Sequence, residues 1–184
     1  MRTFIAIELP ETVIASLGAL GNRLRGAGVR VSWVKPESMH LTLRFLGEID
    51  AEHVDRLRAI LCDAYKGIVP FMLSVRGAGA FPNMQRPSVI WVGVEPLDGG
   101  LATVQMAAES AARAIGSPPE DKPFHSHLTL ARIKDSRSAG PLMACFEQER
   151  DFKAGDFTVR SVSLFSSQLT RHGPIYRCEQ EFPF

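Results

Sequence analysis

The sequence is poor in cysteine and has no long apolar run. Its three cysteines, Cys62, Cys145 and Cys178, are isolated, and none forms a Cys-x-x-Cys pair. Such a set argues against a disulfide framework or a structural zinc site and is typical of a reducing cytoplasm. No stretch approaches the roughly 18 apolar residues of a transmembrane helix, and the start of the chain lacks the apolar centre of a signal peptide. We therefore expect a cytoplasmic protein without a membrane segment.

An excess of charge of either sign is also missing, since the formal net charge is +1. Proteins that hold duplex nucleic acid through many phosphates usually carry a clear basic excess. A nucleic-acid substrate is therefore expected to be held at one end or over a few nucleotides. Four arginines could still make a cleft locally positive: Arg44, Arg132, Arg171 and Arg177.

A tetrapeptide, His-Leu-Thr-Leu, occurs at 40–43 and again at 127–130, and the pattern around both copies repeats. Alternating apolar residues predict strands, and apolar residues at helical spacing predict helices. Besides the two motif strands, the expected strands are Thr3–Glu8, Phe71–Arg76, Ser88–Val94, Phe157–Phe165 and Ile175–Phe182. The expected helices are Glu11–Arg25, Ala51–Tyr65, Leu101–Ile115 and Gly140–Arg150.

This order is β-α-β-α-β twice, followed by one extra strand. It predicts two α+β lobes that face one another across a central cleft, related by a pseudo-twofold axis. The 184 residues fit a single bilobal domain over 1–184, with repeat halves at approximately 1–80 and 87–184. The Gly- and Pro-rich segment Gly77–Pro87 is the expected linker, and the protein is expected to be a monomer.

Side chains on a strand alternate between its two faces, so each motif histidine shares a face with the threonine two residues later. The leucines are expected in the core, which leaves His40 with Thr42, and His127 with Thr129, facing outward. If the lobes pack symmetrically, two imidazoles and two hydroxyls meet in one cavity.

That set of groups suits a phosphodiester. An imidazole accepts or donates a proton near neutral pH, so two of them on opposite sides of a phosphorus atom can act as base and acid. The hydroxyls can donate hydrogen bonds to the non-bridging phosphate oxygens. This scheme needs no metal or other cofactor, and the sequence has no dense Asp, Glu and His cluster to bind one.

Several segments resemble the two-histidine phosphoesterases, and most closely their RNA 2′,3′-cyclic phosphodiesterase branch, also called LigT-like or 2′-5′ RNA ligase proteins. They are MRTFIAIELP, VSWVKPESMHLTLRFLGE, GAFP, PFHSHLTLARI and LFSSQLTRHGPIY, in the family's order. The resemblance implies the LigT-like bilobal α+β fold, with two antiparallel-sheet lobes and flanking helices. It also implies hydrolysis of an RNA 2′,3′-cyclic phosphate to a 2′-phosphomonoester, with 2′-5′ ligation as the reverse reaction. It also implies that His40 is the proton donor, His127 the proton acceptor, and Thr42 and Thr129 the phosphate-binding residues.

Four residues near the motifs are candidates for substrate binding. Strict alternation aims Arg44 at the cleft, with a solvated position at the rim as the alternative. The same alternation turns Arg132 away from the cleft, unless the strand contains a bulge or ends before it. Phosphate contact is still favoured for Arg132, because guanidinium binds phosphate well. Phe45 matches a family position that stacks on a base, whereas alternation alone places it in the core. His125 has the same parity as His127 and is expected near the entrance of the cleft.

Other positions are less informative. The family commonly has proline where this chain has Ser126, so the start of the second motif strand is expected to be looser. Trp33 is expected in the core, with base stacking as the alternative. His53 and His172 are expected at the surface.

Three alternatives remain open. The same chemistry could act on small cyclic nucleotides or on 2′-5′ oligonucleotides, and ligation could be the physiological task. A different class is a module that binds nucleotides or RNA ends without turnover, although binding alone would need neither an acid nor a base.

Overall fold

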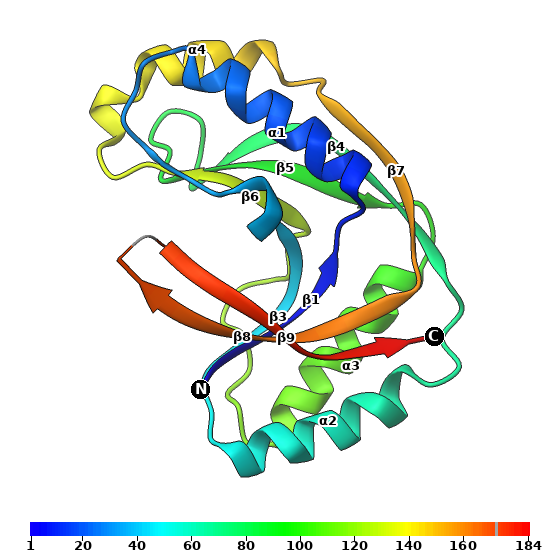
Figure 1. The fold of residues 1–184 in the computed structure, drawn as a ribbon. Coiled ribbons are helices and arrows are strands. Elements are labelled where there is room, and N and C mark those ends of the chain that lie inside the picture. Colours follow the sequence, from blue (N-terminus) through cyan, green and yellow to red (C-terminus); the bar gives the residue numbers. More distant parts are fainter. Residues whose placement is uncertain (172) are drawn as a thin grey trace.

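Two antiparallel sheets and four helices make up the computed structural model over the residues it describes, 1–171 and 173–184 (Figure 1). His172, expected at the surface, lies outside them. The strands are β1 Arg2–Glu8, β2 Ser32–Trp33, β3 His40–Glu48, β4 Phe71–Phe81, β5 Val89–Pro96, β6 His127–Arg132, β7 Lys153–Val159, β8 Ser161–Thr170 and β9 Gly173–Pro183. The helices are α1 Glu11–Arg25, α2 Ala51–Tyr65, α3 Gly100–Ala114 and α4 Gly140–Gln148, with 3₁₀ turns at Pro36–Ser38 and Ser136–Ser138.

Each sheet takes strands from both halves of the chain. The first sheet has the order β3-β1-β8-β9 and the second has the order β2-β6-β5-β4-β7. Helices α2 and α3 pack together beside the first sheet, whereas α1 and α4 cover the second (Figure 1). Helix α1 thus follows a strand of the first sheet and packs on the second. The two lobes are therefore interleaved, so the sequence halves on either side of residues 80–87 do not coincide with the two sheets.

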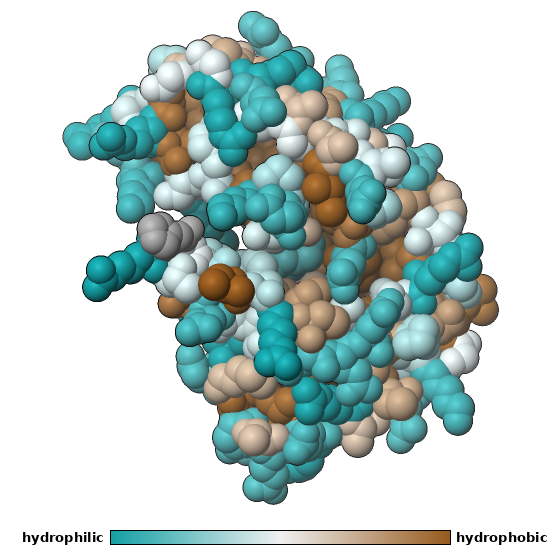
Figure 2. Space-filling model, in the orientation of Figure 1, coloured by the Kyte–Doolittle hydropathy of each residue, from teal (hydrophilic) through white to brown (hydrophobic). Residues whose placement is uncertain are grey.

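The predicted α+β class with two antiparallel sheets is confirmed, and α1 and α2 have the predicted bounds. The four motif leucines are buried, with Leu41, Leu128 and Leu130 at 0% exposure and Leu43 at 3%. Burying one such side chain contributes about 1.5–3 kcal/mol. The leucines therefore hold both motif strands against the core. Over most of the face drawn in Figure 2 the residues are hydrophilic, and apolar residues form separate patches.

Two element predictions were wrong. The expected linker begins inside β4, which continues to Phe81. Gly77, at φ +77°, lies at a register shift of β4, and Gly79 leaves room for the Trp91 side chain where a Cβ atom would clash. Gly77 therefore serves a bulge within β4, and Gly79 serves a close contact with the neighbouring strand β5.

The expected single strand Phe157–Phe165 is two strands, β7 and β8, which separate at Arg160 and join different sheets. Both Val159 and Val162, on either side of the break, are buried, so the sequence pattern does not reveal it. In the described part of the chain, no helix has the length and apolar character needed to cross a membrane.

Candidate active site

One cavity brings the two motifs together. Its volume is about 460 Å³, and His40, Thr42, His127 and Thr129 all line it. Strands β3 and β6 lie in contact although they belong to different sheets. The side chains that share a face in each motif therefore reach the same space.

Both motif strands contain a one-residue bulge directly after the threonine. On β3, Thr42 pairs with Ala6 but Arg44 pairs with the neighbouring Ile5, so Leu43 is the extra residue. On β6, Thr129 pairs with Trp91 and Ala131 with Ile90, so Leu130 is extra. A bulge turns the following residues to the other face of the strand. The second residue after each threonine, Arg44 or Ala131, is therefore buried, and the third, Phe45 or Arg132, is exposed.

This bulge corrects the expectation for Arg44, which does not line the central cavity and is not solvated at its rim. Its side chain is 4% exposed, and its Nε lies 2.7 Å from Glu109 Oε2 on α3. Its two terminal nitrogens contact the Glu120 carboxylate and the Pro118 carbonyl oxygen. Arg44 therefore joins β3 to the segment that follows α3 and leads into the second motif.

The same bulge brings Phe45 and Arg132 to the cleft side. Arg132 lines the central cavity, as its expected phosphate contact requires. Phe45 is 39% exposed, so its alternative position in the core is wrong. It lines a neighbouring cavity of about 600 Å³, which His125, Phe124 and Lys122 also line. His125 is exposed beside His127, with 5.8 Å between the ring centroids.

His40 lies among aromatic rings. Its imidazole stacks on Phe4 with 4.6 Å between the ring centroids. The Tyr176 ring packs against it edge to face, with 5.1 Å between the centroids. Burial lowers the pKa of His40 from 6.5 to about 4, whereas a hydrogen bond with the Ser38 backbone acts in the opposite direction. The imidazole is therefore neutral at pH 7 when no anion is bound.

His127 is fixed through its backbone surroundings. Its Nδ1 lies 2.6 Å from the carbonyl oxygen of His125. Burial lowers its pKa, against that hydrogen bond, and the nearby Arg132 charge lowers it further. The expected looseness at Ser126 is not found, because its hydroxyl donates to Val94 O at 2.6 Å and its carbonyl accepts from Val94 N.

Part of the cavity wall was not assigned from the sequence, except for Trp33, whose alternative role was base stacking. It comes from the segment before β3 and from the start of β9, and comprises Ser32, Trp33, Val34, Lys35, Ser38, Met39, Gly173, Pro174 and Tyr176. Trp33 is partly buried at this wall, and the Arg25 guanidinium lies 4.9 Å from its ring. The segment before β3 is next to the first motif in sequence, and Tyr176 belongs to the expected strand Ile175–Phe182. Apolar periodicity does not indicate that either of them lines the cavity.

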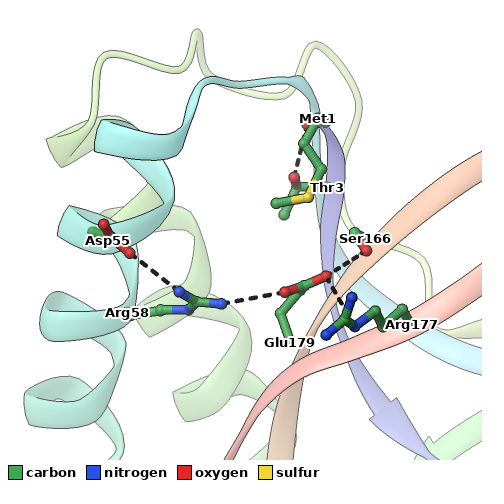
Figure 3. Close-up of polar contacts among 7 residues, drawn as sticks. All are labelled: Met1, Thr3, Asp55, Arg58, Ser166, Arg177 and Glu179. Carbon is green, nitrogen blue, oxygen red and sulfur yellow. Dashed lines mark hydrogen bonds and ion pairs between the residues drawn. The ribbon is translucent and has the colours of Figure 1, made fainter.

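The described residues that line the central cavity include Lys35 and Arg132 but no carboxylate. Arg177, one of the arginines considered for the cleft, instead lies 4.0 Å from Glu179, on the side of β9 that faces α2 (Figure 3). Glu179 also accepts from Arg58 at 3.2 Å and from Ser166 at 2.6 Å. Among residues 1–171 and 173–184, no three His, Cys, Asp or Glu side chains are grouped as a metal site requires.

Comparison with known proteins gives consistent matches over nearly the whole chain. The family model described as LigT like Phosphoesterase matches twice, at residues 7–91 and 92–176. An RNA 2′,3′-cyclic phosphodiesterase of Methanothermobacter thermautotrophicus is 32% identical, over 96% of this chain and 95% of the relative. One from Aeropyrum pernix is 36% identical, over 90% and 93%. A crystal structure of a protein from Thermus thermophilus, TT0787, has a TM-score of 0.83 at 30% identity, covering 100% of this chain and 97% of that one.

Proposed function

Because this chain belongs to the family of LigT-like phosphoesterases, we propose that it hydrolyses RNA-terminal 2′,3′-cyclic phosphates to 2′-phosphomonoesters. The observation that carries the proposal is the cavity of about 460 Å³ lined by both histidines and both threonines of the motifs. The curated relatives named for this activity support the same substrate class.

His127 is the proposed proton acceptor. With a proton on Nδ1 donated to the His125 carbonyl, Nε2 keeps its lone pair. Nε2 takes a proton from water as the water oxygen attacks phosphorus. Because the pKa of His127 is lowered, this nitrogen stays unprotonated at pH values below the usual titration range of histidine.

His40 is the proposed proton donor. As the bond from phosphorus to the 3′ oxygen breaks, His40 gives its proton to that oxygen, which leaves as a hydroxyl. Thr42 and Thr129 donate hydrogen bonds to the non-bridging oxygens, and Arg132 offsets their negative charge. After one turnover the protons return through solvent exchange.

The pKa of His40, about 4 in the empty site, opposes this role, since a donor must be protonated. A bound phosphodiester carries one negative charge, and an opposite charge within a few ångströms favours the imidazolium. Substrate binding therefore raises the pKa of His40 and charges the donor in the complex.

Two neighbouring residues have proposed supporting roles. Phe45, exposed on the neighbouring cavity of about 600 Å³, offers a face on which a base stacks. His125 lines the cavity of about 600 Å³ and holds His127 through its carbonyl oxygen. Arg44 has no proposed contact with substrate, because its guanidinium is buried against two glutamates.

We propose that residues 1–184 act as one bilobal catalytic unit with repeat halves near 1–80 and 87–184. We expect this unit to act as a monomer. The free cysteines suit a cytoplasmic protein. The two histidines complete the proton transfers by themselves, so the proposed reaction uses no metal.

The alternatives differ in measurable ways. A module that only binds would leave a cyclic phosphate end intact. A catalyst accelerates both directions of one reaction, so 2′-5′ joining of RNA ends would use the same four groups. Small cyclic nucleotides and 2′-5′ oligonucleotides are tested as competing substrates.

The decisive experiment is incubation with an RNA that ends in a 2′,3′-cyclic phosphate, with and without EDTA, followed by identification of the phosphate position. We expect a 2′-phosphate at the same rate in both samples. A 3′-phosphate would reverse the assignment of the leaving oxygen, loss of activity with EDTA would require a metal, and an unchanged RNA would contradict the proposed function.

A further inference from the structure

A third cavity, of about 610 Å³, adjoins the His40 side of the central one. It shares His40, Thr42, Arg132 and Tyr176 with the central cavity and adds Arg2 and Ser167, among others. Cavities that bind small ligands commonly measure about 300–1,000 Å³. The two together therefore offer more room than a single cyclic phosphate and its ribose require.

Arg2 lies in a row of side chains that crosses three strands. In the ladders, Arg2 on β1 pairs with Ser167 on β8, and Ser167 pairs with Tyr176 on β9. Neighbouring strands lie about 4.8 Å apart, and residues paired directly across them share a face. The far end of the row, Tyr176, touches the His40 ring at 5.1 Å between centroids. Arg2 therefore lies about two strand spacings from the Tyr176 side of the reaction centre.

The guanidinium of Arg2 is held in place without a carboxylate. It lies 4.7 Å from the centre of the Phe45 ring, a cation–π contact that leaves its N–H groups free at the edges. Glu48, its partner across the β1–β3 ladder, is 3.5 Å from the N-terminal ammonium of Met1 instead. Within residues 1–171 and 173–184, no carboxylate lies in ion-pair distance of Arg2. A positive charge oriented in this way is suited to an anion supplied by the substrate.

We propose that Arg2 binds the phosphate one nucleotide upstream of the reacting cyclic phosphate, so that the site selects RNA ends over single nucleotides. This inference rests on the proposed function, since a 2′,3′-cyclic phosphate ends the RNA and any further phosphate lies on its 5′ side. Ser167 and Tyr176, in the same row, supply hydroxyl groups to that phosphate. Arg132 lines both cavities and is assigned to the reacting phosphate, because it lies on β6 with His127 and Thr129.

The test compares three substrates: a nucleoside 2′,3′-cyclic phosphate, the same compound with a 5′-phosphate, and a dinucleotide that ends in the cyclic phosphate. The wild-type protein is expected to prefer the second and third. Hydrogen bonds to charged groups in proteins correspond to about tenfold or more in binding. Arg2→Ala should therefore reduce the preference about tenfold, through KM and not kcat.

Two further measurements separate binding from a structural role. The dependence of log kcat/KM on log salt for the dinucleotide should become shallower by about 0.7 in Arg2→Ala, as for the loss of one single-strand phosphate contact. Arg2→Lys keeps the charge and should retain most of the preference. Arg177→Ala is the matched control, because this exposed arginine faces Glu179 on the side of α2 and its loss should change no ratio (Figure 3).

The possible failures are distinguishable. If the wild-type protein hydrolyses none of the three substrates, the proposed function is wrong. If it hydrolyses all three equally well, the function stands and the role of Arg2 is wrong. The role of Arg2 is also wrong if Arg2→Ala lowers kcat/KM for all three substrates in proportion. It is wrong as well if the dinucleotide is preferred but the added 5′-phosphate gives no advantage, because a base or ribose would then be recognised.

Discussion

Strands β3 and β6 carry the same tetrapeptide and the same one-residue bulge, yet their histidines lie in different surroundings. His40 is enclosed by aromatic rings, and burial brings its pKa to about 4. His127 is less deeply buried and is tied to the carbonyl oxygen of His125. A repeated backbone therefore presents two imidazoles to one cavity in environments that are not equivalent.

The difference extends to the residues after the bulge. At the second position after the threonine, the first motif has Arg44, in a buried network of charges, and the second has Ala131, at 0% exposure. At the third position the first motif has an aromatic ring, Phe45, and the second has a cation, Arg132. The repeat thus fixes the positions, while the residues there supply different chemistry.

The largest expected effect comes from removing either imidazole. His40→Ala and His127→Ala should each lower kcat for a 2′,3′-cyclic phosphate by on the order of 10²–10⁴, the usual contribution of general acid–base catalysis. Circular dichroism should show the wild-type fold, because the motif leucines are unchanged. A variant that is folded and fully active would remove that histidine from the mechanism.

Arg44→Met should reduce stability strongly, since it leaves Glu109 beside an apolar side chain. Breaking a buried ion pair costs about 3–5 kcal/mol. We expect the lower end of that range in urea unfolding, because Glu109 is 23% exposed and Glu120 is 49% exposed. The double variant Arg44→Met/Glu109→Gln should recover part of the loss. A single variant as stable as wild type would contradict the structural role of this network.

Phe45 and Arg132, each the third residue after its motif threonine, should affect different kinetic constants. Arg132→Ala should lower kcat by on the order of 10–100-fold, because a charge-assisted contact to the reacting phosphate is lost. Phe45→Ala should mainly raise KM, by roughly tenfold, since stacking on a base stabilises substrate and transition state alike. Equal effects of both variants on kcat would mean that Phe45 also acts on the phosphate.

The smallest effect is expected at Ser126. Ser126→Ala removes the hydrogen bond to Val94, which contributes about 1 kcal/mol to the free energy of unfolding. For a domain of this size, that corresponds to a Tm lower by about 3 °C. The activity should change little. A large loss of kcat would show that this bond also orients His127.

The parts of the site that follow from local pattern could be predicted from the sequence. Two-residue alternation gives the shared face of each histidine and threonine, and burial of the leucines agrees with it. Alternation fails at Arg44, because the bulge has no sequence marker: Leu43 is an ordinary strand residue. Alternation places Arg132 on the cleft side only when a bulge is assumed in β6.

Other features depend on contacts between distant segments. The division of 157–165 into β7 and β8 reflects a change of sheet, which apolar periodicity does not record. Tyr176 and Arg2 reach the cavities because β9, β8 and β1 are neighbours in the first sheet, although they lie at opposite ends of the chain. Strand order cannot be read from a single sequence by periodicity, and the residues it brings together were therefore missed.

The pH dependence of hydrolysis tests most directly the claim that two unequal imidazoles act as acid and base. In the free enzyme, His127 must be neutral and His40 charged, and burial lowers the pKa of both below 6.5, that of His40 to about 4. We predict a bell-shaped profile of kcat/KM with its maximum below pH 6.5. Activity falls at lower pH as His127 gains a proton and at higher pH as His40 loses one. The pH profile of kcat should lie at higher pH than that of kcat/KM, because the bound phosphate raises the pKa of both histidines. A flat profile between about pH 5 and pH 9 would contradict the two-histidine mechanism.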